Sequence, residues 1–319
     1  MHRCSKLFLL SVLAVSVLAF AVVFSDYACA TEGGGGHYPN GAEDFMTGVL
    51  PGPGAYYLNY LNYYTASRFN DRNGNSALSN FSVDVIAEVP RFVYVTNYKI
   101  LGADWGFQAI LPMMDEKVRV PAFAGSNDSR VGLGDIEVDP LVLGWHWQNL
   151  HVVAGPEVFL PTGNYDKGEA ANPGRNYWTV EPILAVTFLS DNGFEISSKF
   201  MYDFNTENEA THYTSGQEFH FDYTLGYHFK QWIFGLGGYY YQQMTDDEKE
   251  GYRVNDVGQK CLPGSGIYCD GNRGEVFAFG PQVNYEYKGM NFTLKWQPES
   301  YAENRPEGNN LWFKFICAF

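Results

Sequence analysis

Two side chains in one short segment could supply the nucleophile and the base of a hydrolase. His212 precedes Ser215 by three residues in the run HYTSG. A serine nucleophile needs a base within hydrogen-bond reach and a third group that orients the base. We find no such third group for this pair in the sequence. We therefore expect no enzymatic activity from this segment and assign no catalytic residue.

Three cysteines follow residue 30, and two of them lie close together. Cys261 and Cys269 belong to one Gly/Pro-rich segment, KCLPGSGIYCD. In an exported chain a local disulfide is the ordinary state of such a pair. Two cysteines do not make a zinc site, which needs four ligands. Cys317 lies on an apolar stretch and behaves as a small hydrophobic residue. We assign no metal and no cofactor.

Acidic side chains recur at every second position in several segments, most clearly near residue 220. Glu218, His220 and Asp222 are separated by aromatic residues, and the alternation continues to Phe229. A period of two predicts a β-strand with one polar and one apolar face. After the turn at residues 230–231 the pattern resumes to Gln243, so residues 217–243 are expected to form a hairpin.

The same alternation extends along most of the chain and predicts about twelve strands. Long and short connections alternate between them, which is typical of an up-and-down barrel with loops at one end and tight turns at the other. The longest connections are expected at residues 114–130, 161–176, 205–216, 244–274 and 298–309. The predicted strands cover residues 55–68, 79–97, 103–113, 131–147, 150–160, 177–190, 194–204, 217–229, 232–243, 275–287, 290–297 and 310–319.

These patterns predict an all-β fold, a transmembrane antiparallel up-and-down β-barrel of about 12 strands with an irregular N-terminal arm. A closed sheet leaves no unpaired edge in lipid. The chain ends on Phe319 after apolar residues at every second position, a pattern typical of bacterial outer-membrane proteins. We interpret Phe319 as a signal to the barrel-assembly machinery, which together with outer-membrane lipid is an expected partner.

The N-terminal 30 residues are expected to be a cleaved signal peptide. Arg3 and Lys6 precede an apolar run from Leu7 to Phe24, and Ala28-Cys29-Ala30 is a small-residue cleavage site. An uncleaved anchor and a lipid-modified Cys29 are the alternatives. Residues 31–54 form the Gly/Pro-rich arm and residues 55–319 the barrel. The formal net charge of −15 argues against nucleic acid as a partner.

If the aromatic faces meet lipid, the polar faces line the lumen. A wall in which carboxylates outnumber cations favours cations or neutral solutes, although the same groups could form a network that only stiffens the barrel. The arm could plug the lumen, with Tyr38, Pro39, Glu43 and Asp44 as candidates, or remain a free periplasmic tail. The lumen-lining candidates are Asp84, Glu88, Asp135, Glu137, Asp139, Glu157, Glu181, Glu195, Lys199, Asp203, Glu218, His220, Asp222 and Lys295.

Prolines inside predicted strands conflict with this assignment, because proline removes a donor from the hydrogen-bonded ladder. Bulges, or strands that extend beyond the membrane before the proline, would accommodate them. The prolines concerned are Pro90, Pro140, Pro156, Pro182 and Pro281.

The arm and the first strand carry a family resemblance. The run GGGGHYPNGAEDFMTGVLPGPGAYYLNYLNYY, residues 33–64, is followed by FNDRNGN and contains Tyr38-Pro39, the GAED segment at 41–44 and the PGPG segment at 51–54. It resembles the start of the phenol meta-pathway degradation family of outer-membrane barrels. This resemblance implies a channel or transporter for passive uptake of small hydrophobic or aromatic compounds.

An outer-membrane barrel with a structural or lipid-hydrolysing role is the alternative. The segment at His212 is similar to the His-x-Ser-Asn-Gly arrangement of outer-membrane phospholipase. It departs from that arrangement in its spacing and in the missing asparagine after Ser215.

Overall fold

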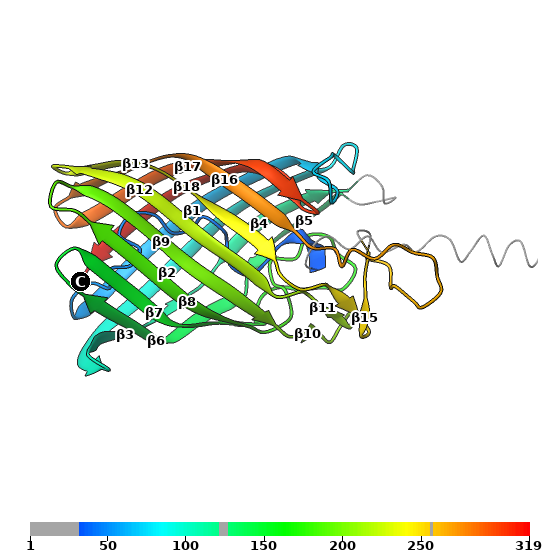
Figure 1. Ribbon diagram of the computed structural model, residues 1–319, viewed down its shortest axis with the longest axis horizontal. Helices are drawn as coiled ribbons and strands as arrows, with labels where there is room; N and C mark the ends of the chain where they lie inside the picture. Colours follow the sequence, from blue (N-terminus) through cyan, green and yellow to red (C-terminus); the bar gives the residue numbers. More distant parts are fainter. Residues whose placement is uncertain (1–31, 121–126, 256–257) are drawn as a thin grey trace, which may run out of the picture.

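The computed structural model describes residues 32–120, 127–255 and 258–319. The expected signal peptide and Thr31 therefore lie outside the described residues. One long sheet closes on itself through the pairing of β1 with both β2 and β18 (Figure 1). The strands of this sheet are β1 (Gly54–Phe69), β2 (Ser82–Ile100), β3 (Ala103–Ile110), β4 (Met113–Arg119), β5 (Asn127–Leu133), β6 (Ile136–His146), β7 (Leu150–Leu160), β8 (Thr179–Leu189), β9 (Phe194–Asn205), β12 (Glu218–Phe229), β13 (Trp232–Gln243), β16 (Glu275–Tyr287), β17 (Met290–Glu303) and β18 (Pro306–Ala318).

The fold is the predicted closed, antiparallel barrel of 12 strands, with β4 and β5 as additional segments. All pairings in the described barrel are antiparallel. β2 pairs with β3 and with β4 at different parts of its length, β3 pairs with β6, and β1 meets β18 to close the ring. The hairpin of β12 and β13 pairs Phe229 with Trp232 across a turn of two residues, as its alternation predicts. Closure pairs the backbone groups of every strand internally, which is the requirement for crossing lipid with strands.

The third and fourth predicted strands are longer than expected, and each is divided into two by a short interruption. β3 and β4 are separated by Leu111 and Pro112, and β5 and β6 by residues 134–135. Most of the loop expected at 114–130 is therefore strand, because β4 and β5 pair with each other beyond the interruption. The segment after β7 covers the outer edge of β5. The N–H of Asn164 donates to the carbonyl oxygen of Leu133, and the N–H of Leu133 donates to the side-chain Oδ1 of Asn164.

The tight turns and the C-terminus lie at one end of the barrel and most long connections lie at the other (Figure 1). The last connection differs from the prediction. The expected loop at 298–309 is a turn of only Asn304 and Arg305, because both strands continue beyond Pro298 and Asn309. There β17 pairs with β16 as far as Glu303, and β18 pairs with β1 as far as Pro306. Pro298 itself is paired with Asn309 in the ladder.

The predicted in-strand prolines are all accommodated within strands. Pro156 and Pro182 face each other across β7 and β8, so that the two missing donors share one position of the ladder. The register of β6 with β7 shifts between Val138 and Leu143, which places Pro140 beside a bulge.

Aromatic and aliphatic side chains on the outer face are exposed all round the barrel. Phe92 on β2 and Phe234 on β13 are 53% and 52% exposed. A soluble protein buries such residues, whereas a barrel in lipid presents them to the hydrocarbon. Among the residues that the structure describes, no helix is long and apolar enough to cross a membrane.

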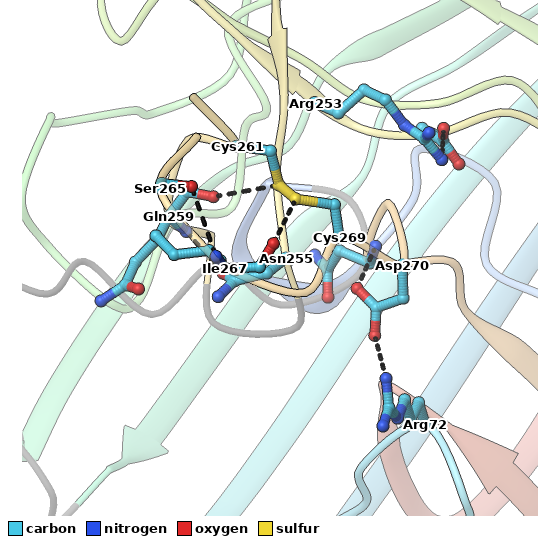
Figure 2. Close-up of a disulfide and its surroundings, with 11 residues drawn as sticks. Arg72, Arg253, Asn255, Gln259, Cys261, Ser265, Ile267, Cys269 and Asp270 are labelled. Atoms are coloured by element: carbon cyan, nitrogen blue, oxygen red, sulfur yellow. Dashed lines mark hydrogen bonds and ion pairs between the residues drawn. A yellow bond between two sulfur atoms is a disulfide. The ribbon is translucent and has the colours of Figure 1, made fainter. Parts of the chain in front are cut away.

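A small second sheet and a disulfide stiffen the long-loop end. The sheet consists of β10 (Glu207–Asn208), β11 (Tyr213–Thr214), β14 (Glu248–Lys249) and β15 (Tyr252–Arg253). Cys261 and Cys269 are joined by a disulfide, and neighbouring Asp270 lies 3.9 Å from Arg72 in the connection between β1 and β2 (Figure 2). The bridged loop is thereby held against a connection distant in sequence.

Candidate channel lumen

The N-terminal arm lies inside the barrel. It starts with η1 (Glu32–Gly34) at the long-loop end, where the N–H of Glu32 donates to Ser215 Oγ, and it reaches β1 at the opposite end (Figure 1). Tyr38, Phe45 and Leu50 are buried against the inner wall. The arm therefore runs the length of the lumen instead of hanging free below the barrel.

Asp222 on β12 is the arm's most connected partner. Its carboxylate accepts hydrogen bonds from Tyr38 Oη at 2.8 Å, from the N–H of Gly41 at 2.8 Å and from the N–H of Glu43 at 2.9 Å. Gly41 has φ of +83°, and a Cβ there would lie 2.3 Å from Gln297 Oε1. A residue with a side chain would strain this turn and push it off Asp222.

Two acidic residues of the arm are paired with cations from the two strands that flank β1. Glu43 lies 2.7 Å from Arg91 on β2, and Asp44 lies 2.5 Å from Lys314 on β18. Burial disfavours a charged Glu43, but Arg91 and Lys314 outweigh that effect and hold the pKa of Glu43 well below its usual range. Lys295 donates to the carbonyl oxygens of Ala42 and Glu43. These contacts tie the arm to several strands at once.

Below this charged section the arm packs by shape and by backbone hydrogen bonds. The N–H of Met46 donates to Glu195 Oε1 at 2.6 Å. Phe45 lies over Gly226 and Gly235, which face each other on β12 and β13. A Cβ on either glycine would come within 2.8 Å of Phe45 Cε1. The pair of glycines thus forms a notch for the aromatic ring.

His37 connects the upper part of the arm to the wall. Its Nε2 lies 2.9 Å from Asp135 Oδ2, its Nδ1 lies 2.8 Å from Thr179 Oγ1, and its ring stacks on Phe159 at 5.1 Å. Burial lowers the pKa of His37, and Asp135 only partly opposes this effect. The neutral imidazole is therefore the favoured form in the folded chain.

A cavity of about 960 Å³ lies above the arm, toward the long loops. The arm from Gly34 to Glu43 forms part of its lining. One wall is apolar and consists of Phe69, Leu78, Phe81, Val83, Val85, Ala87, Val89, Met114, Val118 and Val120. Another part of the lining is polar and includes Arg175, Lys249, Glu299 and Arg305.

The structure places most of the sequence-predicted lumen residues on the buried inner side. Asp135, Glu137, Asp139, Glu157, Glu181, Glu195, Lys199, Asp203, Glu218, His220, Asp222 and Lys295 are all buried. Many of them face the arm or each other and not open water. Glu157, for example, lies 2.8 Å from Lys199, whose Nζ also lies 4.6 Å from the ring centre of Tyr38.

The prediction was wrong for Asp84 and Glu88. Val83, Val85 and Ala87 line the cavity, and Asp84 and Glu88 lie on the opposite face of β2. Ile86 on that outer face is 55% exposed. The assumption that charged residues face inward fails here because this part of the lumen is apolar. Polar neighbours satisfy both carboxylates on the outside, since Tyr63 Oη donates to Asp84 and Asn59 donates to Glu88.

Sequence reasoning missed three cations that shape the lumen, namely Arg91, Arg305 and Lys314. Lys314 could have been found, because it alternates with Phe313 and Phe315 on a strand whose apolar face is evident. Arg91 was hidden by the wrong choice of face on β2. Arg305 lies in a turn that looked like part of a long loop.

The hydrolase-like pair is not assembled in the described chain. The side chain of His212 is 62% exposed and its Nδ1 lies 2.8 Å from Glu207, whereas Ser215 is buried and accepts the N–H of Glu32. No hydrogen bond joins these two described side chains. At the other end of the barrel the N–H of Phe319 donates to the carbonyl oxygen of Ala55, and Phe319 is 84% exposed.

Comparison with known proteins agrees with this architecture. The chain is similar to the crystal structure of the COG4313 outer membrane channel from Pseudomonas putida F1, with a TM-score of 0.73, 15% identity, and coverage of 87% of this chain and 100% of that one. A FadL homologue from Pseudomonas aeruginosa gives a TM-score of 0.36 at 9% identity, with coverage of 82% and 88%. No curated protein matches the chain. Residues 66–315 match the family described as "Putative MetA-pathway of phenol degradation", and the chain belongs to that family.

Proposed function

We propose that this protein is an outer-membrane channel for passive uptake of small hydrophobic or aromatic compounds, and that the arm is a plug that must shift for a solute to pass. The observation that carries the proposal is the cavity of about 960 Å³ with an apolar wall and the arm in its lining. Ligand sites in proteins are commonly about 300–1,000 Å³ and mostly apolar with a few polar groups. The family and the similar outer membrane channel support the same function.

The charges of the lumen agree with a neutral solute. Arg91 and Lys314 are paired with acidic residues of the arm, and Lys199 is paired with Glu157. Paired, buried charges offer little to a passing ion, because a new partner would have to replace the existing one. An apolar solute gains instead from contact with the valine-rich wall of β2.

The test is uptake by proteoliposomes of a toluene-like aromatic and of a small sugar. Val83→Thr combined with Val85→Thr adds hydroxyls to the apolar wall with little change of shape. We expect this variant to take up the aromatic compound more slowly while sugar leakage stays unchanged. Asp84→Asn is the matched control, because residue 84 lies between the two valines on the outer face.

Two results would overturn the proposal. One is that liposomes containing the wild-type protein take up the aromatic compound no faster than protein-free liposomes do. The other is an equal effect of the valine substitutions on both solutes, which would indicate general damage to the barrel.

A further inference from the structure

Three neighbouring strands place one histidine and two carboxylates together beneath the arm. Glu181 on β8, Asp203 on β9 and His220 on β12 each offer one ligand atom, and these atoms lie within 4.8 Å of one another. All three side chains are at most 2% exposed. The ring of Tyr38 covers the histidine at a centroid distance of 5.2 Å.

The two distances from His220 are longer than those of most hydrogen-bonded ion pairs in the described barrel, such as Lys199 with Glu157 at 2.8 Å. His220 Nε2 lies 3.2 Å from Glu181 Oε2 and 3.4 Å from Asp203 Oδ2. Charge-assisted N–H to oxygen bonds are usually about 2.7–2.9 Å long. Two ligands that are each about 2.0–2.1 Å from a tetrahedral zinc ion lie about 3.3 Å apart. The observed separations match the spacing of ligands around a metal.

The cluster also holds buried polar atoms that lack hydrogen bonds. Neither carboxylate oxygen of Glu181 and neither ring nitrogen of His220 makes a hydrogen bond of good geometry, although both side chains are buried and His220 Nε2 lies 3.2 Å from Glu181 Oε2. Asp203 Oδ1 and the adjacent Glu218 Oε1 are also buried without a hydrogen bond. Buried polar atoms are nearly always satisfied, so a group of orphaned ligand atoms indicates a missing partner.

The carboxylates of the cluster require that the missing partner be positively charged. Asp203 lies opposite Glu218 in the ladder of β9 and β12, so carboxylates are stacked across adjacent strands. The second acidic cluster of the described lumen, Glu137, Asp139 and Glu157, already has a cation, because Lys199 lies 2.8 Å from Glu157. Gln108 donates to Asp139 in that cluster. No lysine or arginine forms an ion pair with Glu181 or Asp203 in the described chain.

We propose that Glu181, Asp203 and His220 bind one divalent transition-metal ion, for which zinc is the best fit. An imidazole ligand beside two carboxylates suits zinc better than calcium or magnesium, which prefer oxygen ligands alone. The ion neutralises the two carboxylates and joins β8, β9 and β12 directly below Tyr38. The three side chains supply three of the four ligands of a tetrahedral zinc ion, and a water molecule supplies the fourth. The bound ion stiffens the wall on which the arm rests.

The experiment must supply metal during folding, because the cluster is sealed beneath the arm. The protein is refolded from denaturant into detergent with zinc ions or with a chelator, freed of unbound metal by gel filtration, and analysed for zinc by mass spectrometry. His146 and His151 form an exposed pair with 3.0 Å between their Nδ1 atoms and could bind zinc weakly. All proteins in the test therefore carry His151→Asn.

We expect about one zinc ion per chain in this background. The content should fall to that of the chelator-treated sample in Glu181→Gln and in His220→Gln. His228→Gln is the matched control, since His228 lies on the same strand and contacts a carboxylate, Glu195, at 2.6 Å, outside the cluster. This control should keep its zinc.

A second readout does not depend on whether the ligand variants fold, because it uses only the His151→Asn protein. Cobalt(II) in place of zinc should give a visible absorption band in the His151→Asn protein that excess zinc removes and that excess magnesium or calcium leaves unchanged. Absence of bound zinc and of the cobalt band in the folded background protein would overturn the proposal. So would undiminished zinc in folded His220→Gln, or displacement of cobalt by calcium.

Discussion

Replacement of Asp222 by alanine should release the arm from the barrel wall. The carboxylate accepts two backbone N–H groups, of Gly41 and Glu43, and the hydroxyl of Tyr38, at 2.8–2.9 Å. Each buried donor left without its acceptor costs about 1–3 kcal/mol. Removal of a buried charge offsets part of this cost, so we expect the free energy of arm docking to become less favourable by about 3–6 kcal/mol.

A loss of this size changes the population of the undocked arm strongly. Every 1.4 kcal/mol is a factor of about ten in an equilibrium constant, so the undocked fraction should rise by roughly 10²–10⁴. The contact of Asp44 with Lys314 at 2.5 Å lies on another strand, and the packing of Phe45 on Gly226 of β12 supplies no hydrogen-bond acceptor, so neither replaces the lost acceptor. The barrel itself should stay intact, because its ladder does not depend on the arm.

Hydrogen exchange measured by mass spectrometry is the direct assay, read on peptides that contain residues 38–46. Faster exchange there, with unchanged exchange in β12 and β13, is the expected result for Asp222→Ala. Conductance in planar bilayers should rise in parallel if the arm is the plug. Asp222→Asn keeps the shape and one acceptor oxygen and should show a smaller effect. Asp84→Ala, on the outer face, is the control for loss of an acidic residue.

Equal protection of residues 38–46 in Asp222→Ala and in the wild type would refute the reasoning about docking. Faster exchange without any change in conductance would instead show that the arm docks at Asp222 but does not limit passage. The two readouts therefore separate the position of the arm from its role.

Three further predictions concern the arm and the chain end. Gly226→Val should fill the notch under Phe45 and speed hydrogen exchange around residue 45, because a Cβ there would lie 2.8 Å from Phe45 Cε1. Gly52→Ala, whose Cβ would meet nothing within 4 Å, should leave that exchange unchanged. A normal exchange rate in the valine variant would show that the ring can move aside. Because the folded pKa of His37 is lowered from 6.5, its contribution to arm docking is complete above pH 6.5 and declines as pH falls below that value toward the folded pKa. The hydrogen-exchange rate around residue 37, corrected for the intrinsic rate, should therefore increase as the pH falls from 7.5 to 5. His37→Gln should abolish this increase, and a pH-independent rate in the wild type would contradict the prediction. Deletion of Phe319, whose side chain is 84% exposed, should reduce the amount of assembled barrel in membranes without lowering the stability of protein refolded in detergent. Equal amounts in membranes would argue against an assembly signal.

Much of the barrel could be predicted because strand alternation is a local property. The polar and aromatic faces of residues 218–229 alternate within one strand, and the tight turns lie next to the residues they join. Twelve strands and the antiparallel order follow from such local signals. The buried acids of β6 to β12 could be predicted for the same reason, since each alternates with lipid-facing residues.

What the sequence alone could not decide depends on residues that meet only in three dimensions. Alternation divides β2 into two faces but does not say which face is inside; the apolar cavity against Val83 and Val85 decides that. The arm's place in the lumen depends on pairs such as Asp44 with Lys314, 270 residues apart. The grouping of Glu181, Asp203 and His220 requires the register of three strands. Local patterns determined the wall of this protein, and long-range packing determined what the wall encloses.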